Sequence, residues 1–175
     1  LMDEGIKMAV AEQNAADGLL GKEIEYVSYD NKSEPSESTS VATRLATEDN
    51  VVAILGPATT GAANAQSPAV TRAKVPAILP AATGDGVTMD GDSVLEYVFR
   101  VCFQDSFQGK ALAEFAQTDL QATKAVILVD NSTDYAIGLA DAFKETFTGD
   151  IVAEENFTGG DTDFKAILTN IAKLA

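Results

Sequence analysis

Short apolar segments of strand length recur along this sequence, and stretches with helical spacing lie between and beyond them. VVAIL at 51–55 and VPAILP at 75–80 are apolar without interruption, and KAVILV at 124–129 is apolar after its first residue, Lys124. Uninterrupted apolar runs of this length are typical of strands that are covered on both faces. Because helical patterns alternate with such strands, the sequence predicts an α/β fold in which helices flank parallel sheets.

The same reading predicts the remaining elements. The segment Ile24–Tyr29 alternates apolar and polar residues like a strand, and 97–103 and 151–157 are also predicted to be extended. Residues between about 81 and 96 are predicted to form a loop. Helices are predicted over 1–16, 35–49, 60–74, 108–118, 135–147 and 163–174.

Length and charge limit the classes of function. The 175 residues suggest one domain or two small lobes. The 27 Asp and Glu residues outnumber the 12 Lys and Arg residues, which gives a formal charge of −15. Nucleic acids and anionic membrane surfaces are bound by basic patches, and no segment supplies one. The chain is therefore predicted to bind no nucleic acid, and no apolar run is long enough to cross a membrane.

Catalytic chemistry has little support in the sequence. There is no histidine, and the single cysteine, Cys102, lies in the apolar run FRVCF without an obvious activating group. Asp161 and Asp163 lack the other ligands of a calcium loop, and no G-x-G-x-x-G turn is present. We therefore predict a binding protein with no catalytic residues, no cofactor and no metal site.

The loop GPATTG at 56–61 is the first candidate for a binding site, because it ends a strand and begins a helix. Ligands of parallel sheets bind at the carboxyl ends of the strands, and helix N-termini attract anions. The spacing resembles a phosphate-binding loop, but Ala62 and Ala63 replace the lysine and hydroxyl residue that such a loop needs. Hydroxyls without a cation favour a single carboxylate. The alternative is that Thr59 or Thr60 only caps the helix.

Two further loops provide candidate residues. After the next strand, PAAT at 80–83 supplies the Thr83 hydroxyl and leaves the Ala81 carbonyl accessible to an ammonium group. The alternative for this loop is an ordinary turn stabilised by a Ser or Thr side chain. In DNSTDY at 130–135, Tyr135 is placed to cover a ligand, or else to pack on the preceding helix.

Five segments together resemble the extracytoplasmic solute-binding proteins of branched-chain amino-acid ABC transporters. The segments are AVAEQNAADGLLGKEIEYVSYDNKS (9–33), VVAILGPATTG (51–61), VPAILPAAT (75–83), FRVCFQDSFQG (99–109) and VDNSTDYAIGLADAF (129–143). The resemblance implies the type I periplasmic-binding-protein fold, in which two α/β lobes close on a ligand around a hinge. It assigns residues 1–104 to the first lobe and 105–175 to part of the second, with the hinge near 101–105.

The resemblance also implies roles for the candidate residues. Thr60 would bind the ligand carboxylate, and the Ala81 carbonyl would lie near the ammonium group. Thr83 would be a second carboxylate donor, and Tyr135 would cover the ligand from the second lobe. The implied partners are a branched-chain amino acid and a membrane permease, and the implied location is extracytoplasmic, as a periplasmic protein or a lipoprotein carrying a signal.

In this family a first strand is expected before Leu1 and further second-lobe strands after Ala175, so both lobes are expected to be incomplete. The alternatives are a ligand-sensing domain of similar fold in a receptor or regulator, and a fragment that folds without binding. Unpaired strands pair readily with other chains. Either the strands of both lobes merge into one five-stranded sheet, or copies of the chain self-associate; we expect self-association.

Overall fold

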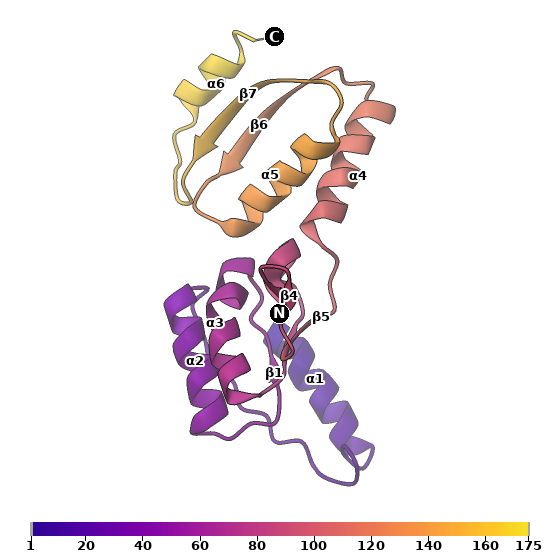
Figure 1. Ribbon diagram of the computed structural model, residues 1–175, viewed down its shortest axis with the longest axis vertical. Coiled ribbons are helices and arrows are strands. Elements are labelled where there is room, and N and C mark those ends of the chain that lie inside the picture. The colour runs from indigo at the N-terminus through magenta and orange to yellow at the C-terminus, as the bar shows by residue number, and fades with distance from the viewer. Residues whose placement is uncertain (1, 175) are drawn as a thin grey trace.

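The computed structural model describes residues 2–174, which form two groups of elements along the long axis of the molecule (Figure 1). The N-terminal group contains the elements from α1 to β5 and ends at residue 100. The C-terminal group contains α4 to α6 and begins at residue 105, and residues 101–104 connect the two. Parallel strands flanked by helices occur in both groups, which confirms the predicted α/β class.

A three-stranded parallel sheet is the centre of the N-terminal group. β2 is its middle strand and pairs with β1 on one side and with β5 on the other. A short antiparallel hairpin, β3 and β4, follows the 3₁₀ turn η1. The elements are α1 (Met2–Ala15), α2 (Pro35–Thr47), β1 (Ile54–Leu55), α3 (Thr60–Ala73), β2 (Ala77–Leu79), η1 (Asp85–Thr88), β3 (Met89–Asp90), β4 (Ser93–Val94) and β5 (Val98–Arg100).

The core of this group lies between the sheet and α3. Leu79 from β2 and Val70 from α3 are fully buried, and the exposed fraction of Val87 from η1 is only 2%. Ala62 and Ala63 are both buried, and Ala63 belongs to this core, where its small side chain lets the helix pack closely. Ala62 and Ala63, which stand where a phosphate-binding loop has its lysine and hydroxyl residue, are thus packing residues at the start of α3.

The C-terminal group is built on a separate two-stranded parallel sheet of β6 and β7. α4 packs closely against α5 at Gly109, where a Cβ atom would lie 2.5 Å from the Ala142 Cβ. Because this sheet is separate, the strands of the two groups do not merge into one sheet. The elements are α4 (Asp105–Thr118), β6 (Lys124–Asp130), α5 (Asp134–Thr146), β7 (Asp150–Phe157) and α6 (Lys165–Ile171).

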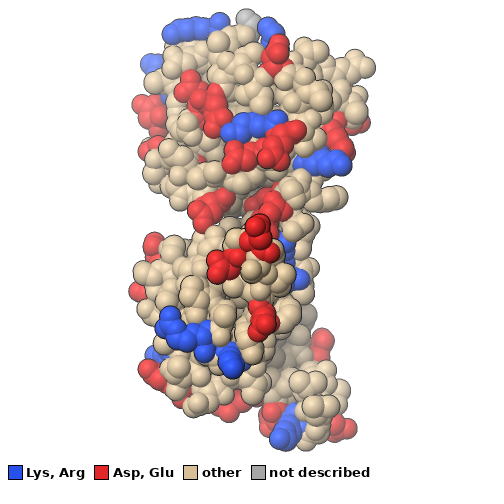
Figure 2. Space-filling model, in the orientation of Figure 1, with Lys and Arg blue, Asp and Glu red and all other residues tan. Residues whose placement is uncertain are grey.

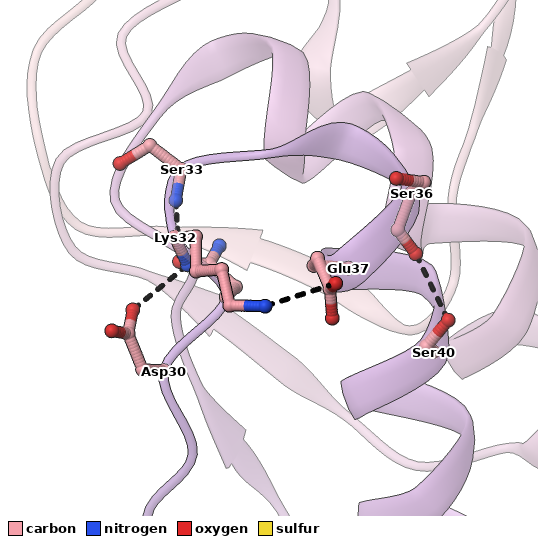
Figure 3. Close-up of polar contacts among 7 residues, drawn as sticks. Asp30, Lys32, Ser33, Ser36, Glu37 and Ser40 are labelled. Carbon is pink, nitrogen blue, oxygen red and sulfur yellow. Dashed lines mark hydrogen bonds and ion pairs between the residues drawn. The ribbon is translucent and has the colours of Figure 1, made fainter.

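Polar contacts in the preceding loop prepare the start of α2 (Figure 3). The Lys32 amide donates to the Asp30 carboxylate at 2.8 Å, while its ammonium group pairs with Glu37 in the first turn of the helix at 3.2 Å. Pro35 then begins the helix, a position where its missing N–H has no consequence. The Ser40 hydroxyl donates to the Ser36 carbonyl at 3.0 Å within the helix.

The predicted strand Ile24–Tyr29 is wrong. Its residues form no ladder with another described segment. Side chains of α1 hold it instead: Asn14 bonds both the Ile24 amide and its carbonyl, and Asp3 accepts from the Tyr26 hydroxyl at 2.7 Å. A strand requires a hydrogen-bonded neighbour, and the alternation of side chains along one segment does not report whether that neighbour exists.

Several predicted boundaries also differ. Only Ile54 and Leu55 of the run 51–55 pair as a strand, and Val52 is 90% exposed. The predicted loop 81–96 contains η1 and the hairpin, and α4 begins three residues earlier than predicted, at Asp105. The last helix ends at Ile171. Within residues 2–174, no helix combines the length and apolar character needed to cross a membrane.

Candidate functional site

The loop after β1 and the loop after β2 meet at Thr60. This residue is buried, and its hydroxyl accepts a hydrogen bond from the Gly84 amide at 3.1 Å. A Cβ at Gly84 would lie 2.4 Å from the Thr60 methyl group, so the two loops are packed tightly together. Thr59 is the N-cap of α3 and its side chain makes no capping bond. The N-cap position that the alternative expected for Thr59 or Thr60 is thus occupied by Thr59, without a hydrogen bond from its side chain.

Thr83 lies at the centre of a second set of contacts. Its carbonyl accepts hydrogen bonds from the Asp105 amide at 2.9 Å and from Arg100 Nη1 at 3.2 Å. Arg100 also donates to the Gly84 carbonyl at 2.7 Å. Ala81 is exposed, and no described residue donates to its carbonyl. The loop after β2 is thus held from both β5 and α4 while the Ala81 backbone stays open.

Tyr135 belongs to the first turn of α5, across from the N-terminal group. It is 40% exposed, and its hydroxyl accepts a hydrogen bond from Gln108 Nε2 of α4 at 3.2 Å. The ring is therefore anchored to the preceding helix through its hydroxyl, while much of it faces solvent. Both interpretations of Tyr135, covering residue and packing residue, are compatible with this position.

Asp134 brings the first turns of α3 and α5 together. Its carboxylate accepts a hydrogen bond from Asn64 Nδ2 at 3.2 Å, and a Cβ at Gly61 would lie 3.5 Å from the same oxygen. Gly61 follows Thr60, and Asp134 precedes Tyr135. The predicted site residues Thr60 and Tyr135 therefore lie at the starts of two helices that contact each other, although Thr60 belongs to the N-terminal group and Tyr135 to the C-terminal group.

Acidic side chains dominate the electrostatics of this region. In Figure 2 they gather on the visible face around the narrow part where the two groups meet. Asp105 is fully buried at the start of α4, and burial raises the pKa of its carboxyl group; Asp85 adds to this effect, whereas the Thr83 hydroxyl and Arg100 oppose it. An anionic ligand must therefore be held by local hydrogen-bond donors rather than by a positive field.

Sequence reasoning missed the charged residues that support the loops. Arg100 and Asp105 had a usable signal, because they are the two charged residues in the otherwise uncharged segment FRVCFQD. Asn64 and Asp134 carried none, because their contact joins residues 70 positions apart. A groove of about 500 Å³ lies elsewhere, between the middle of α3 and the hairpin, and Thr60, Ala81, Thr83 and Tyr135 do not line it.

Comparison with known proteins identifies the family. The model of the periplasmic binding protein family matches residues 1–174. The chain belongs to this family. A curated relative, the amino acid binding protein of Pseudomonas aeruginosa, is 33% identical over 170 residues, which are 95% of this chain and 44% of the relative. The chain spans about half the length of the relatives it matches.

Solved structures of this family share the fold. The isoleucine complex of the branched-chain amino acid transporter substrate binding protein LivJ from Streptococcus pneumoniae is 48% identical, with a TM-score of 0.91. The alignment covers 98% of this chain and 48% of LivJ. A solute binding protein of an ABC transporter from Rhodopseudomonas palustris, in complex with 3,4-dihydroxybenzoic acid, is 28% identical with a TM-score of 0.84, over 99% and 46% of the two chains. The fold is thus the type I periplasmic-binding-protein fold, and the ligands of its members include amino acids and aromatic acids.

Proposed function

We propose that this chain supplies the carboxylate-binding part of an extracytoplasmic receptor that captures an aliphatic amino acid for an ABC importer. The observation that carries the proposal is the convergence of Thr60 and the loop around Thr83 at the first turn of α3. Hydroxyl and amide donors at a helix N-terminus suit a carboxylate, and the absence of a local lysine disfavours a polyphosphate. The similarity to amino-acid receptors supports the same ligand class.

In this proposal the two groups of elements act as lobes. Residues 1–104 bind the carboxylate through Thr60 and Thr83, and the Ala81 carbonyl receives the ammonium group. Residues 105–175 contribute Tyr135 as the covering residue, and the connection near 101–105 serves as the hinge. A permease in the membrane is the expected partner of the loaded receptor, and a leader or lipid anchor on the parent protein would suit this location.

An aromatic carboxylic acid is the second candidate ligand. The relative from Rhodopseudomonas palustris binds such an acid with the same fold, and the donors at α3 would suit its carboxylate equally. The two candidates differ in the ammonium group, which only an amino acid presents to the Ala81 carbonyl.

Calorimetric titration of the full gene product distinguishes these ligands. We expect L-isoleucine, L-leucine or L-valine to bind, and benzoate and 3,4-dihydroxybenzoate to bind far more weakly. A ligand present at one hundred times its dissociation constant should stabilise the folded state by about 2.7 kcal/mol, which a thermal unfolding assay detects. Binding of a benzoate without any amino acid would reject the first candidate and support the second.

A further inference from the structure

The first turn of α4 is held by the other group of elements. Its first amide, at Asp105, donates to the Thr83 carbonyl at 2.9 Å. Its second amide, at Ser106, donates to the Asp85 carboxylate at 3.0 Å, and the Ser106 hydroxyl donates to the other oxygen of that carboxylate at 2.7 Å. The first amides of a helix have no partner within the helix, so they need acceptors from outside it. Here both acceptors belong to the N-terminal group.

Asp85 takes the place of a capping residue in α4 itself. The N-cap residue of this helix, Gln104, has the extended backbone of a cap, but its side chain makes no capping bond. A carboxylate that accepts from the second amide makes the same bond as an N-cap aspartate, and the helix dipole favours a negative charge at this end. The cap of α4 is therefore supplied by η1, from a residue that precedes Ser106 by 21 positions.

The backbone before Asp85 is fixed within the N-terminal group. The Gly84 amide donates to the Thr60 hydroxyl at 3.1 Å, and the Gly84 carbonyl accepts from Arg100 Nη1 at 2.7 Å. These bonds attach the start of η1 to α3 and to β5. The carboxylate that caps α4 therefore moves with the N-terminal group.

The rest of α4 belongs to the C-terminal group. At Gly109 the helix packs directly on Ala142 of α5, where a Cβ would lie 2.5 Å from the Ala142 Cβ. α4 is thus attached to one group at its first two residues and to the other group along its length. Hinges are commonly formed by a few residues at the ends of elements. Because atoms near an axis of rotation move least, the bonds at Asp105 and Ser106 remain intact if the axis passes close to them.

We propose that Asp85 holds the start of α4 and thereby fixes the pivot about which the two groups close on a ligand. This inference rests on the proposed function and deepens it, because it narrows the hinge near 101–105 to its last residue. Asp85 is a positioning residue, since it acts through α4. With its contact in place, the two groups open and close about one axis. Without it, they adopt many relative orientations, and only a fraction of these can close on the ligand.

The spread of distances between the two groups measures the pivot directly. Spin labels are attached to the full gene product at two exposed positions, Glu48→Cys at the end of α2 and Lys165→Cys in α6, with Cys102→Ser removing the native thiol. Without ligand, double electron–electron resonance should give a narrow distribution of distances when Asp85 is present and a clearly wider one for Asp85→Ala. L-isoleucine should bind Asp85→Ala about three- to tenfold more weakly in calorimetry, in proportion to the smaller fraction of molecules that can close.

A cap restored within α4 separates this role from ordinary helix capping. Gln104→Ser places a capping hydroxyl at the N-cap, where the backbone is already extended. Added to Asp85→Ala, it should recover the melting temperature, while the distribution of distances stays wide and the affinity for isoleucine stays low. Asp92→Ala is the control for the loss of charge, because Asp92 is also exposed but lies between β3 and β4. This control should change neither the distribution nor the affinity.

The outcomes are distinct. If the double variant regains both the narrow distribution and the affinity, Asp85 is only a helix cap and the proposal is overturned. An unchanged distribution in Asp85→Ala overturns it as well. If Asp85→Ala does not fold, as judged by its thermal unfolding, the same two measurements on the double variant decide. Failure of the unsubstituted protein to bind any amino acid would instead reject the proposed function, and the distributions without ligand would still test the pivot.

Discussion

Gly109 offers the sharpest test of how the C-terminal group is packed. A Cβ at this position would lie 2.5 Å from the Ala142 Cβ and 2.7 Å from the Phe143 amide nitrogen in α5. One of these atoms is backbone, so no change of rotamer relieves the contact. Replacing Gly109 by alanine must therefore push α4 away from α5.

Two opposing terms set the magnitude for Gly109→Ala. Alanine is favoured over glycine within a helix by about 1 kcal/mol. Overpacking of a close contact costs about 1–3 kcal/mol, and the backbone contact places this site near the upper limit. We therefore expect a net loss of about 2 kcal/mol in the free energy of unfolding, which lowers the melting temperature by roughly 4–8 °C in a chain of this size.

Gly5→Ala is the matched control, because Gly5 lies in α1 and a Cβ there would meet nothing within 4 Å. It should retain the helical gain and melt slightly above the unsubstituted chain. Both variants are compared by calorimetry or circular dichroism during heating. If Gly109→Ala melts as high as Gly5→Ala, the close approach of α4 and α5 does not constrain the fold and the reasoning is refuted.

Four further outcomes are expected. Thr60→Val should weaken amino-acid binding about tenfold or more in calorimetry, because hydrogen bonds to charge contribute about 1.5–3 kcal/mol; unchanged affinity would remove Thr60 from the site. Tyr135→Ala should speed ligand release in stopped-flow experiments, and an unaltered off-rate would contradict its covering role. Hydrogen bonds from Lys7 and Tyr26 lower the pKa of Asp3 from 3.8 to about 2. The link between α1 and the segment 24–28 should therefore be intact above pH 4 and lost as the pH falls toward 2. Amide exchange of that segment should rise on acidification, and an unchanged exchange rate would contradict this. Sedimentation should show association through the unpaired strand edges, and a monomer of 18.3 kDa would reject it.

The helices α2, α3, α4 and α5 were predictable from the sequence because each has buried residues on one face, packed within its own group. The spacing of apolar residues records that face directly. The strands 124–129 and 151–157 were predictable for a related reason, since they pair with each other along their whole length. In these regions the local pattern and the tertiary environment agree.

Elements that depend on a distant partner were not predictable. The segment Ile24–Tyr29 has the alternation of a strand, yet its polar groups bond to α1 side chains.

The hairpin, by contrast, had a local signal that the sequence analysis did not use: Gly91 and Asp92 form a two-residue connection, and Gly91 has a positive φ of 56°. Such a turn between paired residues is typical of a hairpin.

The candidate site divides in the same way. Thr60 and Thr83 follow strands of one parallel sheet, and the carboxyl ends of such strands share an edge, so their proximity follows from the order of elements alone. The groups that hold them do not follow from that order. Arg100 comes from the end of β5 and Asp105 from the start of α4, where the chain leaves one group for the other.

This division has a consequence for specificity. The hydroxyl residues at the strand ends can donate or accept, so they are suitable for many small acids, and the ligands of the related structures include amino acids and aromatic acids. The direction of each hydroxyl depends on what lies behind it. Behind Thr83 lies the start of α4, whose Asp105 amide donates to the Thr83 carbonyl at 2.9 Å. The proposed hinge near 101–105 adjoins this contact, so the same segment that connects the two groups also holds a loop proposed to bind the ligand.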